Sequence, residues 1–196
     1  MPGALRNKTL YALVVFLAIT SCRGKEVPKP RGFFRIDFPE KRYMIFDSDC
    51  PFNFEYPVYG KISNDVADNT KPCWFNIEFP GYKSVIHMSY LPVNNNLAGL
   101  LRESNEFVYS HTVRADAITE QPYRDTVNRV YCMLYDIKGN AASSVQFTAT
   151  DSTGHFLRGA LYFYSQPRED SLAPAIQFFR EDIVHLIETL RWKPGI

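Results

Sequence analysis

The sequence predicts an α+β domain in which an antiparallel sheet carries two packing helices. Short runs that alternate apolar and polar residues fill much of 43–90 and return at 130–164. Two other segments repeat their apolar residues every three or four positions, which is the period of an amphipathic helix. The strands are grouped rather than alternating one by one with helices, and this grouping favours antiparallel pairing.

The chain begins with a segment typical of an exported lipoprotein. Two basic residues precede an apolar run at 9–19, which is too short to cross a bilayer because a spanning helix takes about 20 residues. The sequence ITSC that ends at Cys22 resembles a bacterial lipobox. We therefore expect residues 1–21 to be a signal peptide and Cys22 to anchor the chain in membrane lipid through acyl chains. The alternative is an ordinary signal peptide with a chance cysteine.

Residues 22–32 are expected to form a lipidated tether. They are polar and contain two prolines, so they favour an extended conformation, and about ten extended residues reach roughly 30 Å. The remaining residues, 33–196, have the length of a single domain. Removing the two basic residues of the signal leaves 20 basic against 21 acidic residues, a net charge of −1. This balance argues against nucleic acid as a partner.

Three further cysteines fit an oxidising compartment. No pair forms a C-x-x-C motif, so neither a zinc ribbon nor a thioredoxin-like site is expected. Cys50 and Cys73 both lie beside turn-forming residues, and we expect a disulfide between them. A loop of that length stabilises a fold by ~3 kcal/mol in the chain-entropy model. Cys132 lies in an apolar strand pattern, which predicts a buried thiol. Three independent buried thiols are the alternative.

The strands and helices follow in a definite order. Strand-like alternation occurs at 43–46, 52–56, 74–79 and 83–90, and later at 130–137, 145–150 and 155–164. The later three strands, joined by short turns, predict an antiparallel meander. The segment 63–72 and the segment that passes through Pro122 are expected to be loops. The first helix spans 97–111 after asparagines that supply its N-cap. The last helix begins at Ser171 and stops at Lys193-Pro194-Gly195. This element order is similar to that of the Mog1/PsbP-type sandwich.

The segment Asp151–Gly154 sets an acid, two hydroxyls and a glycine side by side between two strands. A type I turn favours Asp at its first position and Gly at its fourth. We expect Gly154 to be left-handed and the Asp151 carboxylate to accept a backbone N–H. An aspartic protease needs a second such loop, and an elbow-type hydrolase needs G-x-S-x-G; the sequence contains neither. No catalytic residue is therefore predicted.

His155, Arg158 and Gly159 are the candidate residues of a partner surface. A glycine in mid-strand indicates a bulge or the close approach of another backbone, and Arg158 beside it adds a charge. The four histidines are scattered over different elements, and the sequence lacks a calcium loop, an H-E-x-x-H motif, a phosphate loop and a dinucleotide fingerprint. We therefore expect neither a metal nor a cofactor.

Six segments together carry a family resemblance. They are PKPRGFFRIDFPEKRY, CPFNFEYPVYG, KPCWFNIEFPGY, IHMSY, DSTGHFLRGALYFY and DSLAPAIQFF. In this order they resemble the GldD family of gliding-motility lipoproteins of Bacteroidetes, over nearly all of residues 28–193. The resemblance supports Cys22 as the lipid site and transfers no active-site residue.

The resemblance implies a non-enzymatic lipoprotein of the cell envelope, on the outer membrane and facing the periplasm. It implies a role in gliding and in the associated type IX protein secretion apparatus. The expected partners are membrane lipid, through Cys22, and other envelope motility or secretion lipoproteins. The alternative is a module that binds envelope glycan or peptidoglycan, or a degenerate hydrolase, which a deep cleft lined with Asp and Glu would favour.

Overall fold

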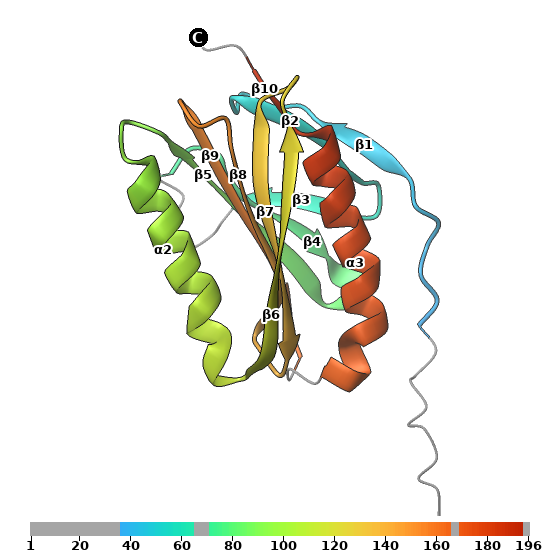
Figure 1. The fold of residues 1–196 in the computed structure, drawn as a ribbon. Helices are drawn as coiled ribbons and strands as arrows, with labels where there is room; N and C mark the ends of the chain where they lie inside the picture. The colour runs from blue at the N-terminus through green and yellow to red at the C-terminus, as the bar shows by residue number, and fades with distance from the viewer. Residues whose placement is uncertain (1–35, 65–70, 166–168, 194–196) are drawn as a thin grey trace, which may run out of the picture. The chain divides into compact units, whose positions relative to one another are not determined.

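The computed structural model describes residues 36–64, 71–165 and 169–193. The expected signal peptide, Cys22 and the tether lie outside these ranges. A seven-stranded antiparallel sheet dominates the fold (Figure 1). In spatial order its strands are β3 (Lys61–Asn64), β4 (Trp74–Phe79), β5 (Ser84–Pro92), β9 (His155–Phe163), β8 (Ser143–Thr150), β7 (Val130–Gly139) and β6 (Ala115–Asp125).

A small second sheet has the order β1-β2-β10. Its strands are β1 (Tyr43–Phe46), β2 (Phe52–Pro57) and β10 (Arg191–Trp192). The helical elements are η1 (Pro80–Tyr82), α2 (Leu97–Tyr109), η2 (Ser110–Val113) and α3 (Glu169–Thr189). No helix in the described part of the chain is long and apolar enough to cross a membrane.

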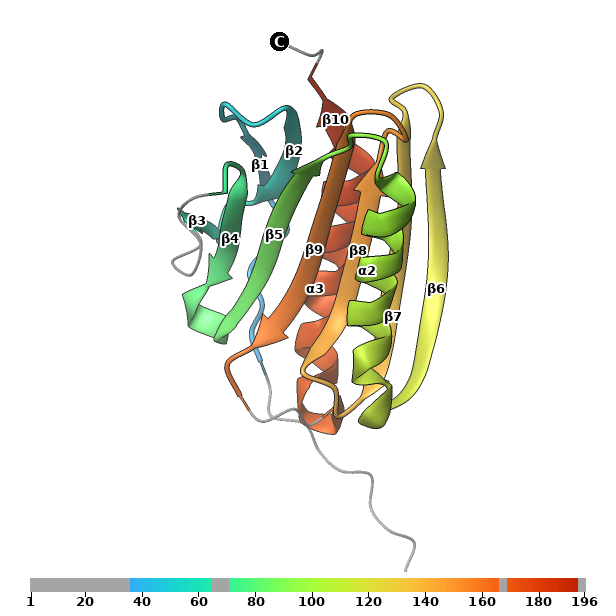
Figure 2. The ribbon, with the colours of Figure 1, turned by 90° about the vertical axis from the view of Figure 1, so that its left-hand side faces the viewer.

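The two long helices cover opposite faces of the large sheet. Figure 2 shows α2 in front of β7 and β8, with α3 behind the same sheet. Strand β8 is consequently buried at all eight of its positions. The face toward α2 carries polar side chains such as Gln146, and the face toward α3 carries apolar ones such as Phe147. The alternation in this strand therefore separates two covered faces, rather than a core face from a solvent face.

Most of the core lies on the α3 side of the large sheet. Aromatic rings connect the layers there. Phe46 of the small sheet stacks on Phe75 of the large sheet with ring centroids 4.6 Å apart. Phe79 of the large sheet contacts Phe179 of α3 with ring centroids 4.5 Å apart. Such aromatic contacts add to the free energy gained by burying apolar surface. A smaller cluster around Val108 and Tyr135 lies under α2.

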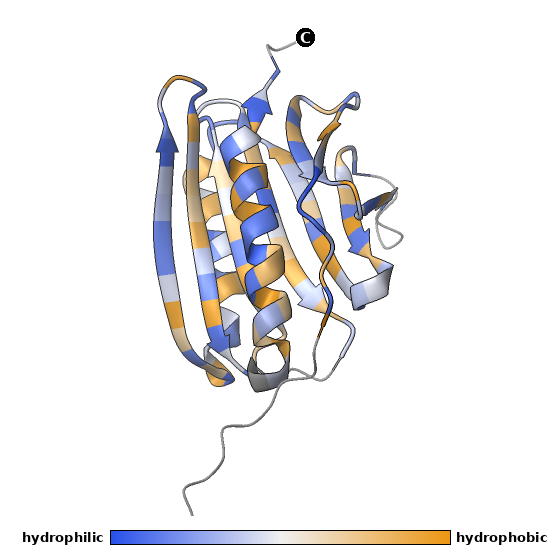
Figure 3. Cartoon of the chain, turned by 90° about the vertical axis from the view of Figure 1, so that its right-hand side faces the viewer, coloured by the Kyte–Doolittle hydropathy of each residue, from blue (hydrophilic) through white to orange (hydrophobic). Residues whose placement is uncertain are grey.

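The predicted fold class is confirmed, including two helices packed on an antiparallel sheet and the β7–β8–β9 meander. Three strands were not predicted. β3 runs into the start of the expected loop at 63–72, β6 includes Pro122 of the other expected loop, and the short β10 follows the last helix. Most of β6 is hydrophilic (Figure 3), which explains why it carries no strand signal. The last helix begins at Glu169 rather than Ser171. The predicted asparagine cap is wrong in detail, because the Asn96 side chain accepts the backbone N–H of Asn94 instead of capping α2.

Cys50 and Cys73 are joined by a disulfide with a Cα–Cα distance of 5.6 Å. This bond links the turn before β2 to the residue before β4, so it ties the small sheet to the large one. Cys132 is a free, buried cysteine. Burial raises the pKa of its thiol to about 12, which keeps it protonated and unreactive at neutral pH.

Candidate functional site

The turn that joins β8 to β9 is organised around the carboxylate of Asp151. Its Oδ1 accepts the backbone N–H groups of Thr153, Gly154 and His155 at 2.8–2.9 Å, and its Oδ2 accepts the Thr153 hydroxyl at 2.7 Å. Burial acts to raise the pKa of Asp151, but these hydrogen bonds outweigh it and hold the pKa well below its usual range. The predicted role of Asp151 as a turn acceptor is therefore correct.

The conformation predicted for Gly154 is wrong. Its φ does not lie in the left-handed region, which is occupied instead by Ser152 at φ 70°. Because three consecutive amides converge on one carboxylate oxygen, the chain reverses at Ser152 and enters β9 with ordinary backbone angles. The turn thus explains the cluster of acid, hydroxyls and glycine by hydrogen bonding alone.

The three candidate residues of the partner surface lie on two different faces of β9. Gly159 and His155 face the α3 side, whereas Arg158 faces α2, since neighbouring residues of a strand point to opposite faces. Gly159 is buried, and a Cβ there would lie 2.1 Å from Phe147 Cε1. The close approach that the glycine indicated is thus real, but the approaching group is an aromatic ring of β8, not a partner backbone.

Arg158 and His155 are both engaged within the domain. The Arg158 guanidinium lies 4.2 Å from the centre of the Phe107 ring, and its Nη2 donates to Gln146 Oε1 at 3.3 Å. Burial lowers the pKa of Arg158. The His155 ring stacks on Trp192 with centroids 5.1 Å apart. The structure therefore brings these two residues into separate contacts rather than into one surface.

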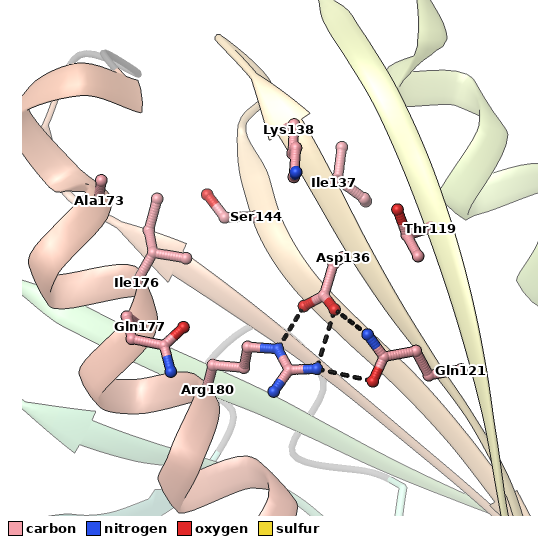
Figure 4. A pocket seen from close by; sticks show the side chains of 10 residues that line it. All are labelled: Thr119, Gln121, Asp136, Ile137, Lys138, Ser144, Ala173, Ile176, Gln177 and Arg180. Carbon is pink, nitrogen blue, oxygen red and sulfur yellow. Dashed lines mark hydrogen bonds and ion pairs between the residues drawn. The ribbon is translucent and has the colours of Figure 1, made fainter.

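A cleft of about 370 Å³ opens between α3 and the β6–β7 pair (Figure 4). Arg180 of α3 forms a bidentate ion pair with Asp136 of β7, with Nε at 2.7 Å and Nη2 at 2.9 Å from the two carboxylate oxygens. Gln121 of β6 closes the network, since its Nε2 donates to Asp136 at 3.0 Å and its Oε1 accepts from Arg180 at 2.9 Å. The other lining residues are Thr119, Ile137, Lys138, Ser144, Ala173, Ile176 and Gln177.

The polar groups at the centre of this cleft already satisfy one another. The hydrogen bonds to Asp136 raise the pKa of Arg180, against the effect of its burial, so the guanidinium stays charged. Asp136 is the one carboxylate among the described lining residues. Across the described ranges, no group of three His, Cys, Asp or Glu side chains is placed to hold a metal ion.

Sequence inspection missed a buried polar centre at Asp182 of α3, whose exposed fraction is 1%. Its Oδ1 accepts the Lys41 ammonium at 2.7 Å and the Tyr43 hydroxyl at 3.0 Å, and its Oδ2 accepts the Tyr59 hydroxyl at 2.7 Å. Burial, together with the Asp182 carboxylate, raises the pKa of both tyrosines. The Lys41 ammonium also lies 3.5 Å from the centre of the Phe178 ring. The centre fastens the segment that enters β1 to α3.

Comparisons with known proteins identify a family and show a distant structural likeness. The model of the family described as gliding motility lipoprotein GldD matches residues 23–192. No curated protein matches the sequence. Among solved structures, the chain is similar to the solution structure of cyanobacterial PsbP (CyanoP) from Synechocystis sp. PCC 6803. The TM-score is 0.49 at 6% identity, over 79% of this chain and 94% of that chain. A TM-score of this size carries no argument about function.

The family match begins one residue after Cys22 and ends at Trp192, the last residue of β10. It therefore covers the expected tether and every strand and helix of the described domain. The chain belongs to the gliding motility lipoprotein GldD family.

Proposed function

We propose that the protein is a non-enzymatic accessory component of gliding motility and of the associated type IX secretion apparatus, and that it acts by binding other envelope lipoproteins. Membership of a lipoprotein family makes it a lipid-anchored protein of the cell envelope. Its position on the outer membrane, facing the periplasm, is part of the proposal. The lipobox-like sequence and the expected tether support a domain that works close to a membrane surface.

The cleft beside α3 does not favour the alternative of a glycan hydrolase. Glycosidases use two carboxyl groups about 5 to 9.5 Å apart, one on each side of the scissile bond. Asp136 has no second carboxylate opposite it in the described lining, and its oxygens are held by Arg180 and Gln121. A role in binding rather than hydrolysis is the simpler interpretation of this domain.

The contact role is carried by the free edge of the small sheet. Strand β1 pairs with β2 on one side, and no strand in the described ranges pairs with its other side. Met44 and Ile45 leave 46% and 63% of their surface exposed on this edge. The edge strand β6 is different, because it carries Pro122 and charged side chains, which are the usual protection against unwanted pairing. The edge at β1 lacks that protection.

We infer that an extended segment of another envelope lipoprotein pairs with the β1 edge. Added strands gain affinity from main-chain hydrogen bonds and specificity from alternate side chains, and Ile45 offers an apolar contact on this edge. About 20 residues separate Cys22 from Tyr43, so the edge lies within roughly 70 Å of the lipid even when the chain is fully extended. A partner anchored in the same membrane satisfies this distance.

Replacing Ile45 by lysine should abolish gliding and secretion while the domain stays folded. A lysine on an edge strand opposes pairing because its charge would lose water on docking. A surface substitution changes the free energy of unfolding by about 0.5 kcal/mol or less. The measurements are colony spreading, release of a secreted protein and a melting curve. Val113→Lys, at a residue 90% exposed elsewhere on the surface, is the control and should behave like wild type. Normal spreading and secretion with Ile45→Lys would remove the β1 edge from the proposal.

Replacing Cys22 by alanine should abolish incorporation of a fatty-acid label and release the protein from the membrane fraction. The thiol is the acceptor expected from the ITSC sequence, and acyl chains supply the free energy of anchoring, ~0.8 kcal/mol per buried methylene. Cys132→Ala, at a buried thiol, serves as the control and should keep the label. Retention of the label in Cys22→Ala cells, or membrane retention without an uncleaved precursor, would contradict lipidation at this residue.

A further inference from the structure

A second hollow, of about 400 Å³, lies beside the Asp151 turn at the junction of the two sheets. Three cationic residues from two distant parts of the chain line it: Arg129, just before β7, and Arg191 and Lys193, in and after β10. We infer that this basic hollow binds a phosphate monoester group. The inference is independent of the contact role proposed for the β1 edge.

The two guanidiniums are held mainly by hydrogen bonds to oxygen atoms that do not belong to carboxylates. Arg191 donates through Nη1 to the backbone oxygens of Glu188 and Leu190 at 3.0 and 2.7 Å, and it forms no ion pair within the described ranges. Arg129 donates through Nη2 to Thr153 Oγ1 at 3.0 Å and to the Asp151 backbone oxygen at 3.3 Å, and it forms a long ion pair, of 4.0 Å, with the Asp151 carboxylate. Fixed guanidiniums with spare N–H groups suit bidentate recognition of an oxyanion.

One residue that lines the hollow has a strained backbone conformation. Arg129 has φ 54°, in the left-handed region that side chains other than glycine rarely adopt. Its carbonyl oxygen accepts the indole N–H of Trp192 at 3.1 Å, so the residue is fixed at both ends. Such strained residues persist where their surroundings hold them, and they cluster at functional sites.

The acids near the hollow are already occupied by hydrogen bonds or exposed to water. Asp151 accepts three backbone amides and a hydroxyl. Hydrogen bonds from Asn128 have the largest effect in lowering the pKa of Asp125, and Arg191 is near enough for its positive charge to help lower it. The Asp125 carboxylate accepts the backbone N–H and the side-chain amide of Asn128 and the backbone N–H of Val127. Asp47 pairs with Lys193 at 3.2 Å, but its side chain is 83% exposed, and exposed ion pairs contribute little. The lining itself holds three cations and one acid, Asp151, so its net charge is positive.

The charge of the site fits a dianion better than a carboxylate. Three cations face the hollow, and a phosphate monoester carries about −1.5 to −2 at neutral pH, whereas a carboxylate carries one charge. Part of the lining is rigid, because the His155 ring stacks on Trp192 and the His155 Nδ1 lies 2.9 Å from the Tyr90 hydroxyl. A preorganised wall lowers the entropy cost of binding.

Titration of inorganic phosphate into the full chain, labelled with ¹⁵N and kept in a non-ionic detergent, tests the inference. The chain has two tryptophans, so its spectrum contains two indole N–H signals. The Trp192 signal should shift with saturation. The Trp74 signal, which belongs to an indole bonded to the Tyr90 carbonyl in β5, should stay still. Sodium chloride at the same ionic strength should move neither signal, and acetate should bind more weakly than phosphate.

Two variants and a matched control locate the site. Arg191→Gln should weaken phosphate binding about tenfold, since one charge-assisted hydrogen bond contributes on that scale. Lys193→Gln should weaken it as well and provides a second test if the first variant folds poorly. Arg102→Gln, at an exposed position of α2, should bind like wild type. An unmoved Trp192 signal, equal affinity in all variants, or acetate binding as tightly as phosphate would each overturn the inference.

Two further probes separate the sources of the phosphate. If glycerol 3-phosphate and soluble dihexanoyl phosphatidic acid bind with similar affinity, the phosphate group alone is recognised, as on a soluble phosphomonoester. If the phosphatidic acid binds at least tenfold more tightly, the natural ligand is a lipid headgroup. If neither probe shifts the Trp192 signal, the hollow does not accept a phosphate monoester and the inference fails.

Discussion

Replacing Gly159 by alanine should destabilise the domain by about 3 kcal/mol, although the change adds one methyl group to a strand. The added Cβ would lie 2.1 Å from Phe147 Cε1 and 2.6 Å from Cζ, closer than carbon atoms approach one another. Phe147 is fully buried on β8 directly opposite Gly159, so its ring has no free space to enter. Urea unfolding measures the loss, and the slope of the transition shows whether the variant still unfolds in one step.

A double-mutant cycle tests whether the ring is the cause. Phe147→Ala alone should cost about 3–5 kcal/mol because it leaves a cavity. In that background Gly159→Ala should cost at least 1 kcal/mol less than in the wild type, since the obstructing ring is gone. Gly99→Ala on α2, where no atom lies within 4 Å of the new Cβ, is the control and should be neutral or stabilising. Strictly additive costs for the Gly159 and Phe147 changes would show that the contact is not responsible.

Replacing Asp182 by alanine should cost about 3–5 kcal/mol, the range observed when one partner of a buried ion pair is removed. The Lys41 ammonium and the hydroxyls of Tyr43 and Tyr59 would each lose a hydrogen-bond acceptor, although the Lys41 side chain, 26% exposed, keeps some contact with water. Asp182→Asn should cost less, because the amide oxygen can still accept two of the three donors. Urea unfolding at pH 7 provides the comparison.

The neighbouring residue supplies the control for this prediction. Glu181 lies 3.9 Å from the same ammonium, but its side chain is 54% exposed. Exposed pairs contribute about 0–1 kcal/mol, so Glu181→Ala should leave stability almost unchanged. If Asp182→Ala and Glu181→Ala were equally mild, the buried centre would not be what holds the segment before β1 against α3.

The strands that sequence could predict are those with one consistently apolar face. β2, β4 and the β7–β9 meander alternate because half of each strand packs into the α3-side core. β6 could not be recognised in this way. Most of its residues are exposed on both faces, and Pro122 lies in its middle, so only pairing with β7 identifies it as a strand. An edge strand takes its conformation from its neighbour rather than from its own pattern.

The candidate sites, too, could be predicted only in part from the sequence. The mid-strand position of Gly159 did indicate a close approach, but only the register that places it opposite Phe147 identifies the approaching group. The Asp182 centre joins α3 to residues more than a hundred positions earlier, and the basic hollow joins the start of β7 to the C-terminal end. Local periodicity contains no information about such distances. The sequence feature that could have indicated the Asp182 centre is the position of this acid next to Ile183, in the apolar stripe of the last helix.

The pairing of β10 with β2 has a consequence for the order of folding. Trp192 of β10 lies opposite Phe52 of β2, so the last strand of the described domain completes the sheet that its first two strands begin. A chain that enters the envelope N-terminus first exposes the aromatic side chains of β2 long before α3 and β10 arrive to cover them. Contacts between such distant segments slow folding, because the chain loses the entropy of closing a long loop before the contacts can form and stabilise it. Folding can therefore finish only after β10 has been exported, because β10 is needed to complete the small sheet.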